Sequence, residues 1–165
     1  MSKIALILAG VVAVVGFWVW SQKGQVKKTV VEKAPAMSGE YVRIKTVLDR
    51  DAGKMRFIIE PVGAPSISLS AFSMEVVMSK KGGKPVLNQG LIGVGWSFPI
   101  SKVENQTLKL SGIYISPTAY VLSGEQEVAV VPIENLGKEV VQVSFGQENT
   151  KFLKKDATVV GFKYE

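Results

Sequence analysis

The side chains that most often perform catalysis are scarce in this chain of 165 residues. It contains no His and no Cys, which removes the commonest general base, the thiol nucleophile and the usual zinc ligands. Residues 41–165 hold three Asp and nine Glu, and the Glu residues are scattered rather than placed as a recognisable acid and base pair. The sequence therefore predicts a protein that is not an enzyme and that holds no cofactor.

Two short motifs resemble ligand loops but lack essential parts. Asp49, Asp51 and Gly53 have the spacing that opens a calcium loop, yet no further acid follows until Glu60. A hairpin turn with Gly53 at a positive φ explains this spacing better, although the sequence leaves calcium binding open. Residues 82–84 (Gly-Gly-Lys) lack the other residues of a phosphate loop and predict a flexible hairpin tip instead.

Four aromatic residues are candidates for recognition. Trp96, with Phe98, Tyr114 and Tyr120, has the chemistry of a stacking platform for sugar rings or of an anchor for a protein partner. The alternative, which the flanking glycines favour, is that Trp96 fills the domain core. The loop at 116–124 is the better contact candidate, because connecting loops are exposed. We keep Trp96, Tyr114 and Tyr120 as candidate partner-binding residues.

An uncharged run occupies residues 4–20, ahead of the domain that holds these aromatic residues. As a helix it would measure about 25 Å, slightly less than a hydrocarbon core roughly 30 Å thick. A secretory signal peptide is the alternative interpretation. Bulky residues stand where small residues should precede a cleavage site, so the sequence favours an uncleaved membrane anchor, followed by a polar linker at 21–40 that acts as a spacer.

One face of the predicted anchor carries small residues. Ala5, Ala9 and Ala13 recur every four residues and Gly16 follows, a pattern that lets another helix approach closely. The hypothesis is self-association into a homo-oligomer, or packing on a partner helix. Because Ala and Gly are common in any membrane span, the pattern is equally compatible with a membrane helix that has no packing partner.

Two arguments disagree about orientation. Lys3 alone precedes the run, whereas Lys23, Lys27, Lys28 and Lys33 follow it, and the positive-inside bias taken alone keeps the domain in the cytoplasm. The short N-terminal tail offers few charges to count, and the type of domain favours the outer side. We expect a single-pass membrane protein whose domain is extracytoplasmic, either periplasmic or at the cell surface.

The positive charge is mild and spread out. The chain carries a net charge of +6, of which +3 falls on residues 41–165. No basic run is interleaved with aromatic residues, so a nucleic-acid partner is not predicted. The lysines after the anchor favour an anionic lipid surface, and the remaining lysines are typical of a soluble surface.

Residues 41–165 read as one β-rich domain. Alternating or apolar segments at 41–48, 54–60, 72–78, 91–100, 107–116, 125–134, 139–145 and 157–164 predict strands. Ile67 and Leu69 alternate in the opposite phase to Phe72 and Met74, which predicts a bulge or bend near Ala71. No segment shows helical periodicity. The fold class is therefore all-β, a single antiparallel β-sandwich of the jelly-roll or immunoglobulin-like kind.

Four segments, at 70–77, 95–98, 104–112 and 122–133, resemble successive strands of a cohesin-like domain, which is similar in fold to bacterial cellulose-binding sandwiches. The resemblance spans residues 54–164 and is one of pattern. Residues 78–83 and Pro132 depart from it, so a dockerin partner does not follow. The resemblance implies a rigid, envelope-exposed sandwich used for binding or assembly.

Two classes of function remain. The first is a membrane-anchored interaction or adhesion module of the cell envelope that binds a protein or a glycan. The second is a structural subunit of a larger membrane-associated assembly, such as a pilus-like, secretion or virion complex, that packs through the small-residue face of its N-terminal helix.

Overall fold

The computed structural model describes residues 39–165, which belong to one compact unit. The predicted membrane helix at 4–20 and most of the predicted linker at 21–40 lie outside the described residues. In the part of the chain that is described, no helix combines the length and the apolar character that crossing a membrane requires. The anchor and the linker therefore stay predictions.

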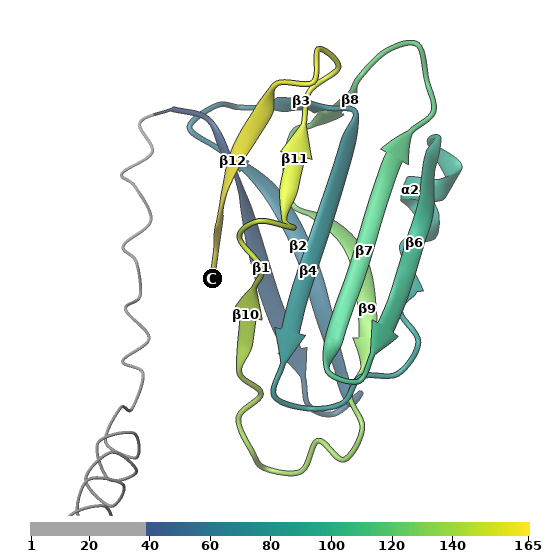
Figure 1. The fold of residues 1–165 in the computed structure, drawn as a ribbon, viewed down its shortest axis with the longest axis vertical. Helices are drawn as coiled ribbons and strands as arrows, with labels where there is room; N and C mark the ends of the chain where they lie inside the picture. The colour runs from purple at the N-terminus through teal and green to yellow at the C-terminus, as the bar shows by residue number, and fades with distance from the viewer. Residues whose placement is uncertain (1–38) are drawn as a thin grey trace, which may run out of the picture. The chain divides into compact units, whose positions relative to one another are not determined.

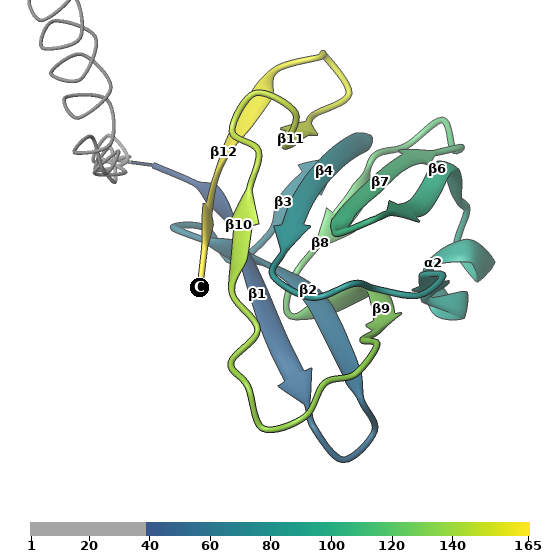
Figure 2. The ribbon, with the colours of Figure 1, turned by 60° about the horizontal axis from the view of Figure 1, so that its bottom comes forward.

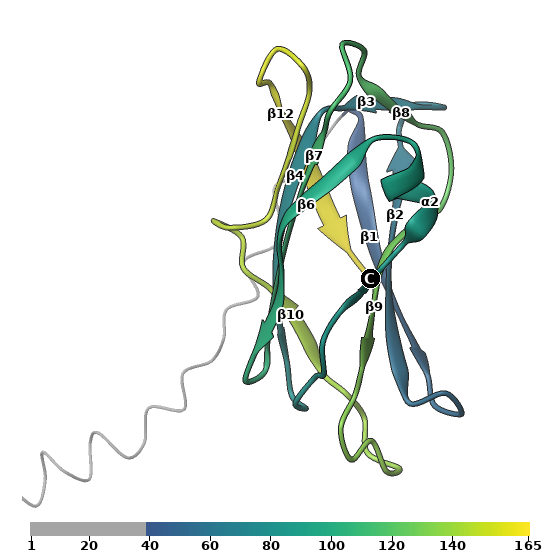
Figure 3. The same ribbon diagram turned by 90° about the vertical axis from the view of Figure 1, so that its right-hand side faces the viewer.

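Two facing layers of strands make up the domain (Figure 1), and Figure 3 shows them edge-on. In spatial order, the first layer contains β5 (Val86–Leu87), β9 (Gln126–Pro132), β2 (Lys54–Val62), β1 (Tyr41–Asp49) and β12 (Val159–Tyr164). The second contains β11 (Lys151–Leu153), β4 (Ala71–Met78), β7 (Thr107–Tyr114) and β6 (Trp96–Glu104), and β10 (Val143–Phe145) also pairs with β4. The β11–β12 pairing joins the layers, and the predicted β-sandwich is confirmed.

A short two-stranded ribbon crosses one end of the sandwich. It consists of β3 (Ile67–Leu69) and β8 (Tyr120–Leu122). Its inward residues Ile67, Leu69 and Leu122 are buried, whereas Ser68 and Val121 lie opposite each other on the outer side and are exposed. We call this end of the domain the β3–β8 end, and the other, where the β1–β2 and β6–β7 hairpins turn, the hairpin end.

The core lies between the two layers and follows from period-two alternation. Every second residue of β4, and of β7 as far as Gly112, is buried, because successive side chains of a strand point to opposite faces. These residues meet apolar side chains of β1, β2 and β9 in one continuous cluster. Its largest fully buried members include Phe57, Phe152, Met74, Leu108 and Leu110. Each such side chain stabilises the fold by about 1.5–3 kcal/mol relative to an exposed one.

The predicted β1–β2 hairpin is confirmed in its details. Asp49 pairs with Lys54 at the end of the ladder. The Asp49 carboxylate accepts a hydrogen bond of 2.9 Å from the backbone N–H of Ala52, and Gly53 adopts φ +63°. A glycine is suited to that backbone conformation because it has no Cβ.

The predicted break near Ala71 is also confirmed. β3 ends at Leu69 and pairs with β8, whereas β4 begins at Ala71 and pairs with β7. The change of phase in the sequence therefore marks the point where the chain leaves the ribbon for the second layer.

The elements differ from the sequence predictions in four respects. The predicted strand at 91–100 begins instead as a short helix, α2 (Gln89–Gly93), and the strand starts at Trp96. The predicted loop at 116–124 contains β8, and β11 was not expected. The pairing is not purely antiparallel, since β1 and β12 run parallel.

Local capping explains the helix that the sequence pattern missed. The side-chain oxygen of Asn88 accepts a hydrogen bond from the Gly90 N–H, and Leu91 alone of the helical residues is buried. Five residues are too few to display a helical period. Figure 2 shows α2 at the side of the sandwich that β6 and β9 form.

The tight contact at Gly112 yields a first prediction. A Cβ added there would lie 2.6 Å from Cε1 of Phe72 and 3.1 Å from Cε3 of Trp96, and both rings are buried. We expect Gly112→Ala to lower the free energy of unfolding by about 1–3 kcal/mol through overpacking. Urea denaturation measures this change in the free energy of unfolding. Gly124→Ala is the matched control, because a Cβ at that position meets nothing within 4 Å; equal stability of the two variants would contradict the packing described.

Candidate functional site

The structure brings the three candidate aromatic residues together. The ring centroids of Trp96, Tyr114 and Tyr120 lie 5.5–5.7 Å apart in every pairing. Trp96 also packs on Phe72 at 5.3 Å. Gly95, at φ +108°, turns the chain beneath the Tyr114 ring. The cluster therefore links β4, β6, β7 and β8 at one corner of the sandwich.

Within this cluster Trp96 belongs to the core. Its side chain is only 4% exposed, and in the described part of the chain its Nε1 is buried without a hydrogen-bond partner. A surface platform on Trp96 is therefore not formed. Tyr114 and Tyr120 stay half-buried, and the Tyr120 hydroxyl donates to Oε1 of Gln126 at 3.1 Å. Burial raises the pKa of Tyr120. A partner contact through the two tyrosines stays a prediction.

The next candidates are the Asp49 turn and the small-residue face predicted for helix packing. Asp49 is engaged in its own turn, and among residues 39–165 no three His, Cys, Asp or Glu side chains gather as a metal site. The small-residue face predicted for helix packing, formed by Ala5, Ala9, Ala13 and Gly16, lies outside the described residues.

The outer face of the first layer is covered with ion pairs, and we call it the paired face. Arg43 and Lys45 reach Glu60 at 3.1 and 3.0 Å, and Lys45 also reaches Glu125 at 2.6 Å. The hydrogen bonds to Glu125 and Glu60 raise the pKa of Lys45. The hydrogen bond from Lys45 in turn lowers the pKa of Glu125. Further along, Arg56 meets Glu127 at 2.5 Å. The charges of this face are largely satisfied by one another.

The outer face of the second layer has a different character. The register of β11, β4, β7 and β6 arranges its side chains in rows across the strands. The row nearest the β3–β8 end is mostly apolar, and it consists of Leu153, Ala71, Ile113 and Ser97. The next row centres on the small hydroxyl residues Ser73 and Ser111, with Lys151 and Ile100 at its sides. Two rows nearer the hairpin end hold charged residues, together with Val77 and Thr107. We call this surface the docking face.

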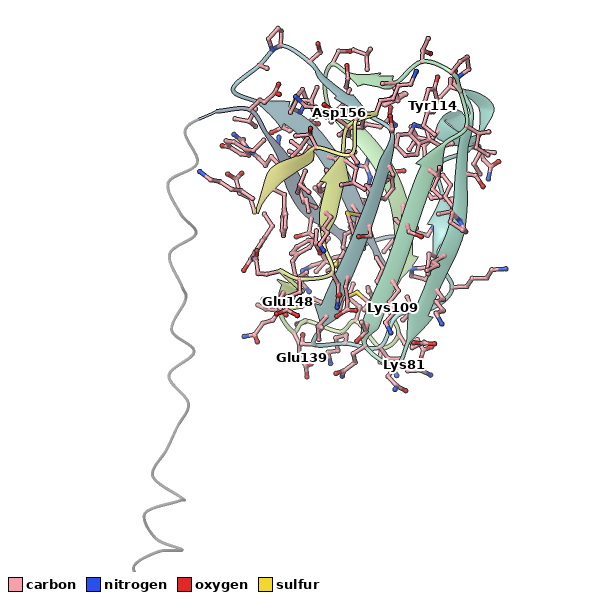
Figure 4. The ribbon with its side chains drawn as sticks, turned by 45° about the horizontal axis from the view of Figure 1, so that its top comes forward. Lys81, Lys109, Tyr114, Glu139, Glu148 and Asp156 are labelled. Atoms are coloured by element: carbon pink, nitrogen blue, oxygen red, sulfur yellow. The ribbon has the colours of Figure 1, made fainter. Side chains whose placement is uncertain are left out.

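Its charged part surrounds a shallow hollow of about 270 Å³, lined by Glu75, Glu104, Asn105, Thr107 and Lys109. Glu104 lies between Lys102 at 2.7 Å and Lys109 at 3.4 Å, and these hydrogen bonds lower its pKa. The Glu75 carboxylate accepts a hydrogen bond of 3.2 Å from the Asn149 side chain. Figure 4 shows Lys109 toward the hairpin end, with Lys81 and Glu139, and Tyr114 toward the opposite end. Polar groups are thus held in place where another molecule has access to them.

The docking face was not predicted from the sequence. The signal was present in the alternation of β4, where Ser73 and Glu75 fall between buried residues, and of β7, where Lys109 and Ser111 do the same. Which of these outward residues become neighbours depends on the β4–β7 register. Alternation within one strand does not contain that information.

No protein-family model matches the sequence, and no curated protein matches it. Solved structures of similar fold are cohesin modules. One is the sixth cohesin from scaffoldin B of Acetivibrio cellulolyticus in complex with a mutant dockerin, with 18% sequence identity, a TM-score of 0.55, and coverage of 78% of this chain and 95% of that one. Another is a type I cohesin–dockerin complex from Clostridium thermocellum, with 9% identity, a TM-score of 0.52, and coverage of 77% and 94%. At these identities the likeness establishes the fold alone: this chain contains a cohesin-like β-sandwich.

Proposed function

We propose that this chain is a protein-interaction module without catalytic activity, and that its docking face contacts a folded protein partner. The observation that carries the proposal is the contrast between the two outer faces. On the paired face, Arg43, Lys45 and Arg56 already have acidic partners. The docking face combines small side chains, exposed apolar groups and positioned charges.

The composition of the docking face suits a protein partner. Ala71, Ser73 and Ser111 form a low floor, since none extends far from the sheet. Ile113 and Val77 are exposed above it and offer apolar area that leaves water on binding. Glu75 and Lys109 lie opposite each other on β4 and β7 and supply charged hydrogen-bonding groups. Burying the paired face would require more ion pairs to lose water, which is costly, than burying the docking face, where Glu104 pairs with Lys102 and Lys109.

A protein is favoured over a glycan as the partner. Sugar rings bind on exposed aromatic faces, and the indole ring of Trp96 is covered. The similar solved structures are described as cohesins in complex with dockerins. We carry over the class of partner, a folded protein, and not its identity.

We further propose that the uncharged run at 4–20 holds the module at a membrane, with the domain on the outer side of the cell envelope. The run has the length and composition of a short membrane span. The alternative, a structural subunit of a larger membrane-associated assembly, is supported by the small residues Ala5, Ala9, Ala13 and Gly16 on one face of that run.

Two valines of nearly equal exposure allow a matched test of the docking face. Val77 on β4 is 42% exposed on the docking face, and Val47 on β1 is 41% exposed on the other outer face. We expect Val77→Asp to reduce capture of the partner from source membranes about tenfold, which corresponds to about 1.4 kcal/mol. Val47→Asp should leave capture unchanged. Quantitative mass spectrometry of the proteins crosslinked to each variant measures how much partner it captures relative to the unmodified chain. Loss with Val47→Asp and retention with Val77→Asp would refute the assignment of the face.

The absence of Cys makes the orientation directly testable. Val140 is 76% exposed, so Val140→Cys introduces one accessible thiol. We expect a membrane-impermeant maleimide to label this variant in intact cells, because the domain is proposed to be extracytoplasmic. Labelling that appears only after the cells are permeabilised would show that the domain faces the cytoplasm.

A further inference from the structure

The β3–β8 end of the domain exposes further apolar side chains beyond those of the docking face, of which Val159 continues the row of Leu153 and Ala71. Ile115, directly after β7, is 71% exposed, and Val121 on the outer side of the ribbon is 56% exposed. Val159, the first residue of β12, is exposed as well. These three exposed apolar residues come from three separate segments at this end of the domain.

The loops at this end are held together by contacts. Lys154 forms an ion pair with Glu40, and the Lys155 amine donates to the backbone carbonyl of Pro117. The Asp156 carboxylate accepts a hydrogen bond of 3.0 Å from the Thr158 N–H. The charges near the apolar side chains therefore already have partners, and the loops at 115–119 and 154–158 lie side by side (Figure 1).

The same end receives the chain from its N-terminal side. Glu40 contacts Lys154, and a Cβ on Gly63 would lie 2.5 Å from the carbonyl oxygen of Gly39. The described domain thus begins beside the loops that expose Ile115 and Val159. In the sequence, only residues 21–38 separate Gly39 from the uncharged run that ends at Trp20.

The hairpin end offers a contrast. Its loops carry Asp51, Lys80, Lys81 and Glu139. Lys81 pairs with Glu134 at 3.1 Å, and Lys80 pairs with Glu139. Val140 is the exposed apolar residue of the loop between β9 and β10. Beside its ion pairs the hairpin end exposes Val140, whereas the β3–β8 end exposes Ile115, Val121 and Val159.

We propose that the β3–β8 end docks on the surface of the lipid bilayer, with Ile115, Val121 and Val159 inserted among the headgroups. The inference rests on the proposed membrane anchor, because a flexible linker of about twenty residues would hold the domain about 25 Å from the surface on average. Linker lysines, including Lys23, Lys27 and Lys28, favour a bilayer that contains anionic lipid. In this position the docking face stands beside the bilayer, open to a partner.

Single-cysteine variants of the full chain test this proposal, since the chain has no other Cys. Ile115→Cys, Val121→Cys and, as the control at the hairpin end, Val140→Cys are labelled with an environment-sensitive fluorophore. Each is reconstituted into phosphatidylcholine–phosphatidylglycerol vesicles containing lipids that are spin-labelled near the headgroup. Inserted apolar side chains reach roughly 5–10 Å into the boundary of headgroups and acyl chains, so positions 115 and 121 should lose about half of their emission or more, and position 140 almost none.

Each outcome decides a different claim. Equal, low quenching at all three positions in chains that float with the vesicles would overturn the docking inference and leave the anchor standing. Chains that do not float with the vesicles would overturn both the anchor and the inference. Val77→Asp, which alters the docking face alone, should leave the quenching at position 115 unchanged; a loss of quenching in that variant would show that the two surfaces are not independent.

Discussion

The register of β4 on β7 is the constraint on which the rest of the structure depends. Phe72 lies opposite Gly112, and Met74 lies opposite Leu110; all four positions face the core, and the missing side chain of Gly112 leaves room for the rings of Phe72 and Trp96. A slip of one residue would move the apolar set to the outside and the polar set to the inside. The same register therefore fixes the core and places Ser73 beside Ser111 and Glu75 beside Lys109 on the outer surface.

Sequence reasoning predicted the features that are encoded locally. Alternation revealed most of the strands, the Asp49–Gly53 spacing predicted the first hairpin, and the change of phase at Ala71 marked the passage from β3 to β4. It failed where long-range contacts decide. The five residues of α2 are helical because Asn88 caps them and Leu91 is buried, and β12 runs parallel to β1 although nothing in its own residues shows which strand it joins. The docking face was missed for the same reason, since it exists only once strands distant in the sequence are aligned.

The two faces and the two ends of the sandwich are chemically distinct. One face satisfies its charges internally, as the Lys45–Glu125 and Arg56–Glu127 pairs show, and this keeps the surface soluble without making it adhesive. The other face keeps the apolar side chains of Val77, Ile100 and Ile113 exposed. One end exposes Ile115 and Val121, while loops at the other end are tied by ion pairs. In the proposed arrangement, the apolar end meets lipid and the docking face meets protein, so one rigid domain serves both contacts.

Oxidative footprinting of side chains in the captured complex tests the central claim, that the docking face is where the partner binds. Hydroxyl radicals modify exposed apolar side chains, and the exposed residues Ile113, Ile100 and Val77 report on the docking face while Val47 reports on the paired face. The account predicts that partner binding protects the first three residues and leaves the modification of Val47 unchanged. Protection of Val47, with continued modification of Ile113, Ile100 and Val77, would contradict it.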